Sequence, residues 1–240
     1  MNALLNRILD TSTVEAGGEI LPLHSNMDRE EGELISAAFE KVQPETSLEI
    51  GCAYGISALF ACDAMKADQR AVRHIVIDPM QSTQWRGIGI ENLRRAGFGG
   101  SIELIEEGSE TALPRLHAAN TRIQAAIVDG WHTFDHALVD FFYVNRMLDV
   151  GGVVILDDTN WPGLARLANL INAYPAYEVI GTVGEPRREH GVKAVRTAVR
   201  RALAAHVSAR MFRRSVDYPR CFAFQKVAGD TRNFDWHAEF

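Results

Sequence analysis

Short apolar runs alternate with segments of helical period along most of the chain. The apolar runs are rich in β-branched residues and span four to seven residues, as expected for strands that are buried on both faces. These runs lie at 47–50, 74–78, 101–106, 125–129, 152–158, 177–183 and 221–227. Helical spacing follows the first five of them, at 56–66, 85–96, 110–117, 134–148 and 164–173. The alternation predicts a parallel, doubly wound α/β sheet with its functional loops at the carboxyl ends of the strands.

The two ends of the chain depart from this alternation. Residues 26–42 have a helical pattern, in which Asp28 and Glu31 have the spacing of a capping box. The last two apolar runs flank a long helical segment at 187–214. We therefore expect N-terminal helices and a sheet of seven strands, with a helical insertion between strands six and seven.

Composition and cysteine usage place the chain among globular proteins of a reducing compartment. Hydrophobic residues make up 47% and charged residues 23% of the chain, which are ordinary globular values. The N-terminal segment MNALLNRILD is too short and polar for a signal peptide, and no apolar run reaches membrane-spanning length. The cysteines, Cys52, Cys62 and Cys221, contain no CxxC spacing, which disfavours a disulfide framework or a zinc site. We expect a cytoplasmic protein that does not associate with membranes.

Positive charge is concentrated in one segment of an otherwise acidic chain. The formal net charge is −6, yet residues 185–214 contain nine basic and two acidic residues. Within this segment the helix at 187–214 has one apolar face surrounded by arginines, so we expect it to pack on the sheet or on a second subunit of a homodimer. Contact with an anionic small molecule is an alternative. Nucleic acid is disfavoured, because interleaved aromatic residues are missing and the chain is acidic overall.

A glycine loop follows the first predicted strand. In LEIGCAYGIS (48–57), Gly51 allows a sharp turn and the close approach of a ligand, and the next helix begins directly after the loop. Asp78, at the end of the second strand, can accept hydrogen bonds from a ribose diol. Cys52-Ala53 stands in place of the second glycine of a dinucleotide fingerprint, and no Gly-Lys-Ser/Thr follows. The loop thus predicts a nucleoside ligand without pyrophosphate.

These residues resemble the cofactor loop of class I S-adenosylmethionine-dependent methyltransferases. The resemblance rests on E-x-G-x-x-x-G-x-S at 49–57, on Asp78 and on the VDG sequence at 128–130, and it covers roughly residues 31–163. It implies a Rossmann-like, mostly parallel sheet of seven strands with an antiparallel last strand. It also implies a single methyltransferase domain over 1–240, with an N-terminal helical cap (1–45), a cofactor-binding core (46–160) and a C-terminal part (161–240). The implied S-adenosylmethionine-binding residues are Glu49, Gly51, Gly55, Ser57, Asp78, Gly108, Ser109, Asp129 and Trp131. Another Rossmann-like nucleotide binder is the alternative.

Three carboxylates follow the fourth and fifth strands. Asp129 ends the fourth strand, and Asp157 with Asp158 ends the fifth. Neighbouring strands lie roughly 5 Å apart, so these carboxylates should converge at one edge of the sheet. A divalent cation such as Mg²⁺ or Mn²⁺ would neutralise their repulsion. The alternative is that Asp157 or Asp158 caps the next helix, and that Asp129 binds backbone amides.

Within the family, these positions resemble those of the metal-dependent catechol and caffeoyl-CoA O-methyltransferases and the macrocin-type sugar O-methyltransferases. His132 stands where the catechol-type enzymes carry a lysine. A neutral imidazole can accept a hydroxyl proton near pH 7, so the resemblance implies catalytic roles for His132 and Asp129. His132 as a metal ligand, or as a cap of the helix that follows, remains an alternative.

The expected reaction is methyl transfer from S-adenosylmethionine to a hydroxyl of a small-molecule acceptor. A methyltransferase acting on nitrogen or nucleic acid is a second interpretation. It is disfavoured because the Asn/Asp-Pro-Pro-Tyr/Phe motif of many amino-methylating enzymes does not follow the fourth strand. A non-catalytic cofactor-binding protein of the same fold is a third interpretation, which the acidic residues and His132 oppose.

Overall fold

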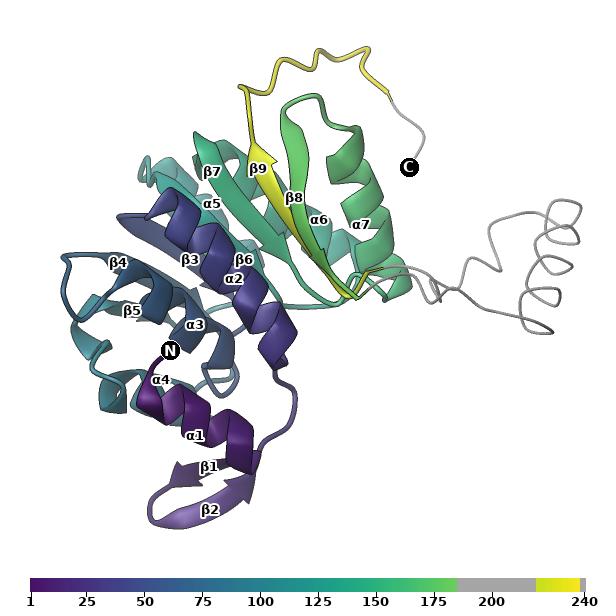
Figure 1. Cartoon of the computed structure of the whole chain (residues 1–240). Coiled ribbons are helices and arrows are strands. Elements are labelled where there is room, and N and C mark those ends of the chain that lie inside the picture. Colours follow the sequence, from purple (N-terminus) through teal and green to yellow (C-terminus); the bar gives the residue numbers. More distant parts are fainter. Residues whose placement is uncertain (185–218, 238–240) are drawn as a thin grey trace, which may run out of the picture.

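A seven-stranded sheet forms the centre of the computed structural model, which describes residues 1–184 and 219–237 (Figure 1). The strands have the order β5-β4-β3-β6-β7-β9-β8. Their bounds are β3 (Thr46–Ile50), β4 (Arg73–Ile77), β5 (Ile102–Ile105), β6 (Ile123–Val128), β7 (Leu148–Leu156), β8 (Tyr177–Val183) and β9 (Cys221–Lys226). Neighbours from β5 to β7 pair in parallel, and β9 pairs antiparallel with both β7 and β8. The predicted antiparallel last strand is therefore confirmed, and every predicted apolar run contains a strand.

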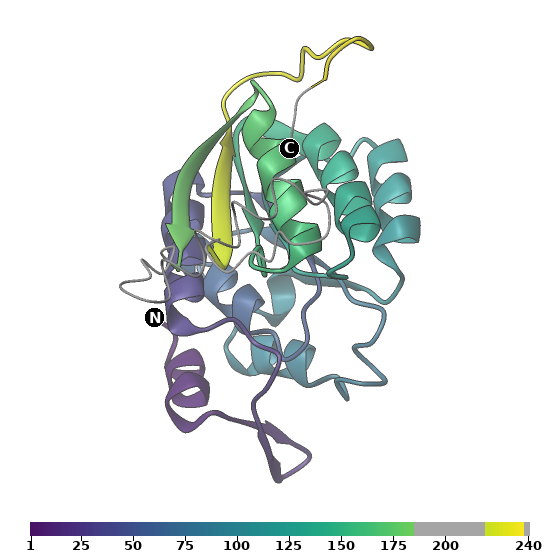
Figure 2. The same cartoon turned by 90° about the vertical axis from the view of Figure 1, so that its right-hand side faces the viewer.

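Helices cover both faces of the sheet. They are α1 (Ala3–Thr11), α2 (Arg29–Val42), α3 (Ile56–Met65), α4 (Ile88–Arg95), α5 (Ser109–Ala118), α6 (Phe134–Met147) and α7 (Pro162–Ala173). Figure 2 shows the sheet nearly edge-on, with α2 on one side and α7 on the other. Along β6, Ala125 and Ile127 are buried in the core beneath α2 and α3, whereas Ala126 and Val128 are buried beneath α5, α6 and α7. Because successive strand residues point to opposite faces, this apolar strand requires helices on both sides.

The N-terminal region is more varied than the helical cap that we expected. An antiparallel hairpin of β1 (Thr13–Ala16) and β2 (Glu19–Pro22) lies between α1 and α2. Its turn is Gly17-Gly18, and both glycines have positive φ, at 56° and 88°. Such short strands carry too little apolar alternation to be recognised. The capping box of α2 is confirmed, because the Glu31 backbone N–H donates to Asp28 and the Asp28 N–H donates to Glu31.

Other predictions about the chain have mixed outcomes. Helix α4 begins at Ile88 and not at residue 85, because Arg86 and Gly87 have φ of 55° and 71°, outside the helical range. Cys52, Cys62 and Cys221 are free and buried, as expected. No helix within 1–184 or 219–237 is long and apolar enough to cross a membrane. The predicted basic helix at 187–214 lies outside the described residues.

Candidate active site

A cavity of about 750 Å³ opens at the carboxyl ends of the parallel strands. Its walls come from the loops after β3, β4, β5, β6 and β7, from the segment before α2, and from the start of β9. A doubly wound sheet binds ligands at this edge. The described structure thus brings together loops that are far apart in the sequence.

The glycine loop forms one wall of this cavity and packs closely against its neighbours. Gly51, directly after β3, has φ of 84°, and a Cβ atom there would clash with the carbonyl oxygen of Asp129. Gly55, the N-cap of α3, has φ of 79°, and its Cβ would lie 2.9 Å from the carbonyl oxygen of Gly89. Gly51 lines the cavity, whereas the second glycine lets the loop approach α4. Both positions therefore require glycine for backbone packing.

Asp78 holds the glycine loop from the neighbouring strand. It is buried directly after β4, and it lines the cavity. One carboxylate oxygen accepts hydrogen bonds from the backbone N–H groups of Cys52 (3.2 Å) and Ala53 (3.0 Å), and from the side chain of Gln81 (2.9 Å). The other oxygen accepts from the Met80 N–H at 2.8 Å. Asp78 thereby sets the shape of the loop, and its bond to a ribose diol stays a prediction.

A buried chain of polar side chains runs behind the loop. The Ser57 hydroxyl, in the first turn of α3, donates to Glu49, and the other oxygen of Glu49 lies 2.8 Å from Nε2 of His74. Nδ1 of His74 lies 2.8 Å from the Ser47 hydroxyl oxygen. Ser47 and Glu49 are two residues apart on β3 and therefore share a face of the sheet. Glu49 is fully buried and positions Ser57, which is the member of the chain that lines the cavity.

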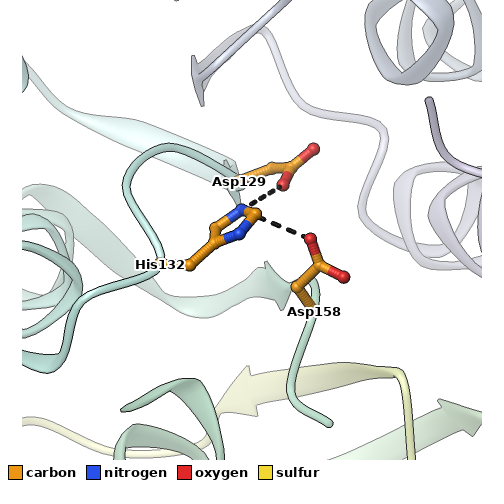
Figure 3. A group of neighbouring side chains, drawn as sticks. All are labelled: Asp129, His132 and Asp158. Carbon is orange, nitrogen blue, oxygen red and sulfur yellow. Dashed lines mark ion pairs between the residues drawn. The ribbon is translucent and has the colours of Figure 1, made fainter. Parts of the chain in front are cut away.

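Asp129, His132 and Asp158 meet in the same cavity (Figure 3). Asp129 follows β6 and Asp158 lies just after β7, and these strands pair in parallel with Val128 beside Leu156. Nε2 of His132 lies 3.6 Å from a carboxylate oxygen of Asp129 and 3.3 Å from one of Asp158. One ligand atom from each of the three residues lies within 4.8 Å of the others. The predicted convergence of Asp129 and Asp158 is therefore observed, with the imidazole between them.

The charges of this group shift one another's protonation. Burial raises the pKa of the Asp129 carboxyl to about 6, and the Asp158 charge adds to this, while His132 opposes it. The two carboxylates raise the pKa of the His132 imidazole above its ordinary 6.5, although burial acts in the opposite direction. The two carboxylates therefore make His132 a stronger base than a free histidine.

Asp157 does not belong to this group, although we expected it to share a metal site with Asp129 and Asp158. Its side chain is 7% exposed, and burial together with the Asp129 charge raises its pKa well above the usual range. Asp157 is buried, whereas Asp158, with φ of 51°, is half-buried and supplies the ligand atom that completes the group. His132 stands in the place that we had assigned to Asp157.

The remaining predicted cofactor residues line the same cavity. Gly108 follows β5, and Ser109 is the first residue of α5. Trp131 lies in the loop after β6, and its side chain is 61% exposed, so it is not packed beneath the loop. They line the cavity, and their contact with the cofactor stays a prediction.

Several cavity residues were not found from the sequence. The segment before α2, the aromatic residues beside the loops and the start of β9 contribute Asn26, Met27, Asp28, Glu31, Tyr54, Trp85, Trp161 and Arg220. Arg220 pairs with Asp28, with Glu30 at 3.1 Å and with Glu31 at 3.3 Å. These partners are about 190 positions apart in the sequence, so no local pattern could reveal the contact.

Comparison with known proteins agrees with this arrangement. Residues 48–159 match the family model described as "Methyltransferase domain". No curated protein sequence matches the chain.

Solved structures share the fold at low sequence identity. An O-methyltransferase from Bacillus cereus in complex with S-adenosylhomocysteine has a TM-score of 0.64 at 16% identity, over 94% of this chain and 91% of that one. TomG from Streptomyces achromogenes, an O-methyltransferase involved in tomaymycin synthesis and solved with S-adenosylmethionine, has a TM-score of 0.62 at 15% identity, over 95% and 91%. Cofactor-bound Rv0187 from MTB has a TM-score of 0.61 at 14% identity, over 94% and 88%. Residues 48–159 thus match a methyltransferase domain, on a fold that these solved structures share.

Proposed function

We propose that the protein transfers the methyl group of S-adenosylmethionine to a hydroxyl of a small-molecule acceptor, with His132 as the proton acceptor. The observation that carries this proposal is the position of His132 between Asp129 and Asp158, in the same cavity as the glycine loop. The solved O-methyltransferases with the same fold support a hydroxyl as the acceptor group.

The cofactor would lie along the wall formed by the glycine loop. Gly51 and Ser57 would face its methionine part, Asp78 its ribose, and Gly108, Ser109 and Trp131 its adenine. The N-terminus of α3 suits the methionine carboxylate, because backbone N–H groups there have no partner within the helix. Glu49 and Gly55 would act from behind, by holding Ser57 and the loop in place.

The chemistry asks little of the protein beyond alignment and proton removal. The sulfonium is already activated, so the site must place the methyl carbon in line with the acceptor oxygen. His132 would take the hydroxyl proton as the carbon–oxygen bond forms, and Asp129 with Asp158 would stabilise the resulting imidazolium.

A metal-assisted variant is the second candidate, and Asp129, His132 and Asp158 carry it. Two carboxylates and an imidazole, with ligand atoms within 4.8 Å, are a donor set that fits a divalent cation such as Mn²⁺ or Mg²⁺. When bound, such a cation would hold the acceptor hydroxyl and lower its pKa. In that case His132 would serve as a ligand, and the base would be another group or water.

Calorimetry with S-adenosylhomocysteine tests the cofactor part, and absence of binding would refute the proposal. His132→Ala should then lower the rate of methyl transfer to a hydroxyl acceptor by about 10²–10⁴ while the affinity for S-adenosylhomocysteine stays unchanged. His136→Ala is the matched control, because His136 is half-buried nearby on α6 and does not line the cavity. A wild-type rate in His132→Ala would remove its role as base.

A further inference from the structure

The acceptor side of the cavity carries more acidic side chains than the proposed chemistry uses. Besides the group around His132, the carboxyl groups of Asp28, Glu31 and Asp157 line this side. They come from the start of α2 and the end of β7. A ligand placed here therefore meets a wall of oxygen acceptors.

Asp157 has an acceptor atom that the described residues leave unused. The residue is 7% exposed, and its Oδ1 is buried without a hydrogen-bond partner. An unpaired buried acceptor typically costs about 1–3 kcal/mol, which a ligand with an N–H donor would offset. This wall thus favours a donor group on the bound molecule.

Positive charge on the described wall is already matched. Arg220 is the only lysine or arginine among the described residues that line the cavity. Its guanidinium lies within ion-pair distance of Asp28, Glu30 and Glu31, so little of its charge is left for a ligand. An anionic acceptor group would meet carboxylates without a free cation. Our expectation of an anionic acceptor rested on residues 187–214, which lie outside the described structure.

An aromatic ring completes this side of the cavity. Trp161 follows β7, lines the cavity and is 52% exposed, and its ring centroid lies 5.2 Å from that of His132. The face of an indole attracts organic cations, and an indole beside carboxylates is a common way of binding an ammonium group.

We infer that the methyl acceptor carries an ammonium group, which Glu31 and Asp157 hold beside Trp161 while the acceptor hydroxyl faces His132. This inference rests on the proposed function, because it assigns the acceptor of that same reaction. It concerns charge recognition and involves no bond-making step of its own.

Three small molecules with one phenyl ring test the inference by binding alone. Benzylammonium, benzyl alcohol and benzoate are titrated into the protein saturated with S-adenosylhomocysteine, in the presence of EDTA. We expect benzylammonium to bind at least about tenfold more tightly than the other two, as charge-assisted hydrogen bonds allow. Glu31→Gln and Asp157→Asn should each weaken its binding by about tenfold or more.

The controls separate the alternatives. Glu30→Gln should leave the affinity unchanged, because Glu30 also pairs with Arg220 but does not line the cavity. Glutamine at position 31 preserves the capping box of α2, and circular dichroism checks that each variant is folded.

Equal binding of the three molecules, no binding of benzylammonium, or unchanged affinity in both variants overturns the inference. Displacement of benzylammonium by Mg²⁺, measured without EDTA, would also overturn it by assigning these carboxyl groups to a metal. Failure to bind S-adenosylhomocysteine in the first titration would instead count against the proposed function.

Discussion

Gly51→Ala tests how closely the glycine loop is tied to the acidic wall. Gly51 has φ of 84°, in the left-handed region that disfavours side chains. An added Cβ would clash with the carbonyl oxygen of Asp129 and would lie 2.7 Å from its carbonyl carbon. Because neither backbone segment is free to move, the substitution should push the loop and Asp129 apart.

The size of the effect follows from two contributions. A non-glycine residue in the left-handed conformation costs about 1–2 kcal/mol. Overpacking against a fixed neighbour typically costs a further amount of about 1–3 kcal/mol. We therefore expect Gly51→Ala to lower the free energy of unfolding by about 2–5 kcal/mol.

Gly151→Ala isolates the first contribution. Gly151 has φ of 90°, and nothing lies within 4 Å of its added Cβ, so only the backbone cost of about 1–2 kcal/mol applies. Urea unfolding of both variants, followed by circular dichroism, measures the difference. Calorimetry should show weakened S-adenosylhomocysteine binding in Gly51→Ala alone. Equal losses of stability in the two variants, with unchanged cofactor affinity, would refute the reasoning.

Three further predictions concern titration and metal binding. If His132 is the base, kcat/KM should fall as the pH drops through the raised pKa of its imidazole, because a protonated imidazole cannot accept a proton. The same loss of kcat/KM at low pH in His132→Gln would contradict this role. If a divalent cation is used, EDTA should abolish methyl transfer and Asp158→Asn should weaken Mn²⁺ binding measured by calorimetry, whereas full activity in EDTA would leave the metal-free mechanism. Burial raises the pKa of the Asp140 carboxyl from 3.8 to about 6. The free energy of unfolding therefore falls as the pH rises through this range, because the buried carboxyl must ionise in the folded protein. Asp140→Asn should therefore raise the free energy of unfolding at pH 8 by about 1–3 kcal/mol and give no gain below pH 4, as urea titrations at the two pH values would show.

The fold was largely predictable because burial on both faces leaves a clear pattern. A strand such as β6 must be apolar at every position, and helices must follow it to cover both faces. The boundaries that failed were set by backbone conformation instead. Arg86 and Gly87 delay the start of α4 through positive φ, which spacing alone does not reveal. The β1–β2 hairpin was missed for the related reason that its strands are short and mostly exposed.

The candidate site was predictable where a strand end delivers a side chain to the sheet edge. Asp78 and Asp129 follow strands directly, so their positions follow from the sheet order and the register. The choice between Asp157 and Asp158 did not follow from the sequence. It depends on one dihedral angle and on the alternation of side chains at the end of β7.

The sequence by itself determined the class of fold, the glycine loop and the edge at which the carboxylates gather, because these depend on local periodicity and on residues next to strand ends. Only the tertiary structure decided that His132 lies between Asp129 and Asp158, that Asp157 is not part of this group, and that Arg220 meets the start of α2. Those contacts join segments separated by up to about 190 residues, and their geometry arises when the layers pack together. The local sequence pattern does not predict contacts between residues so far apart in the chain.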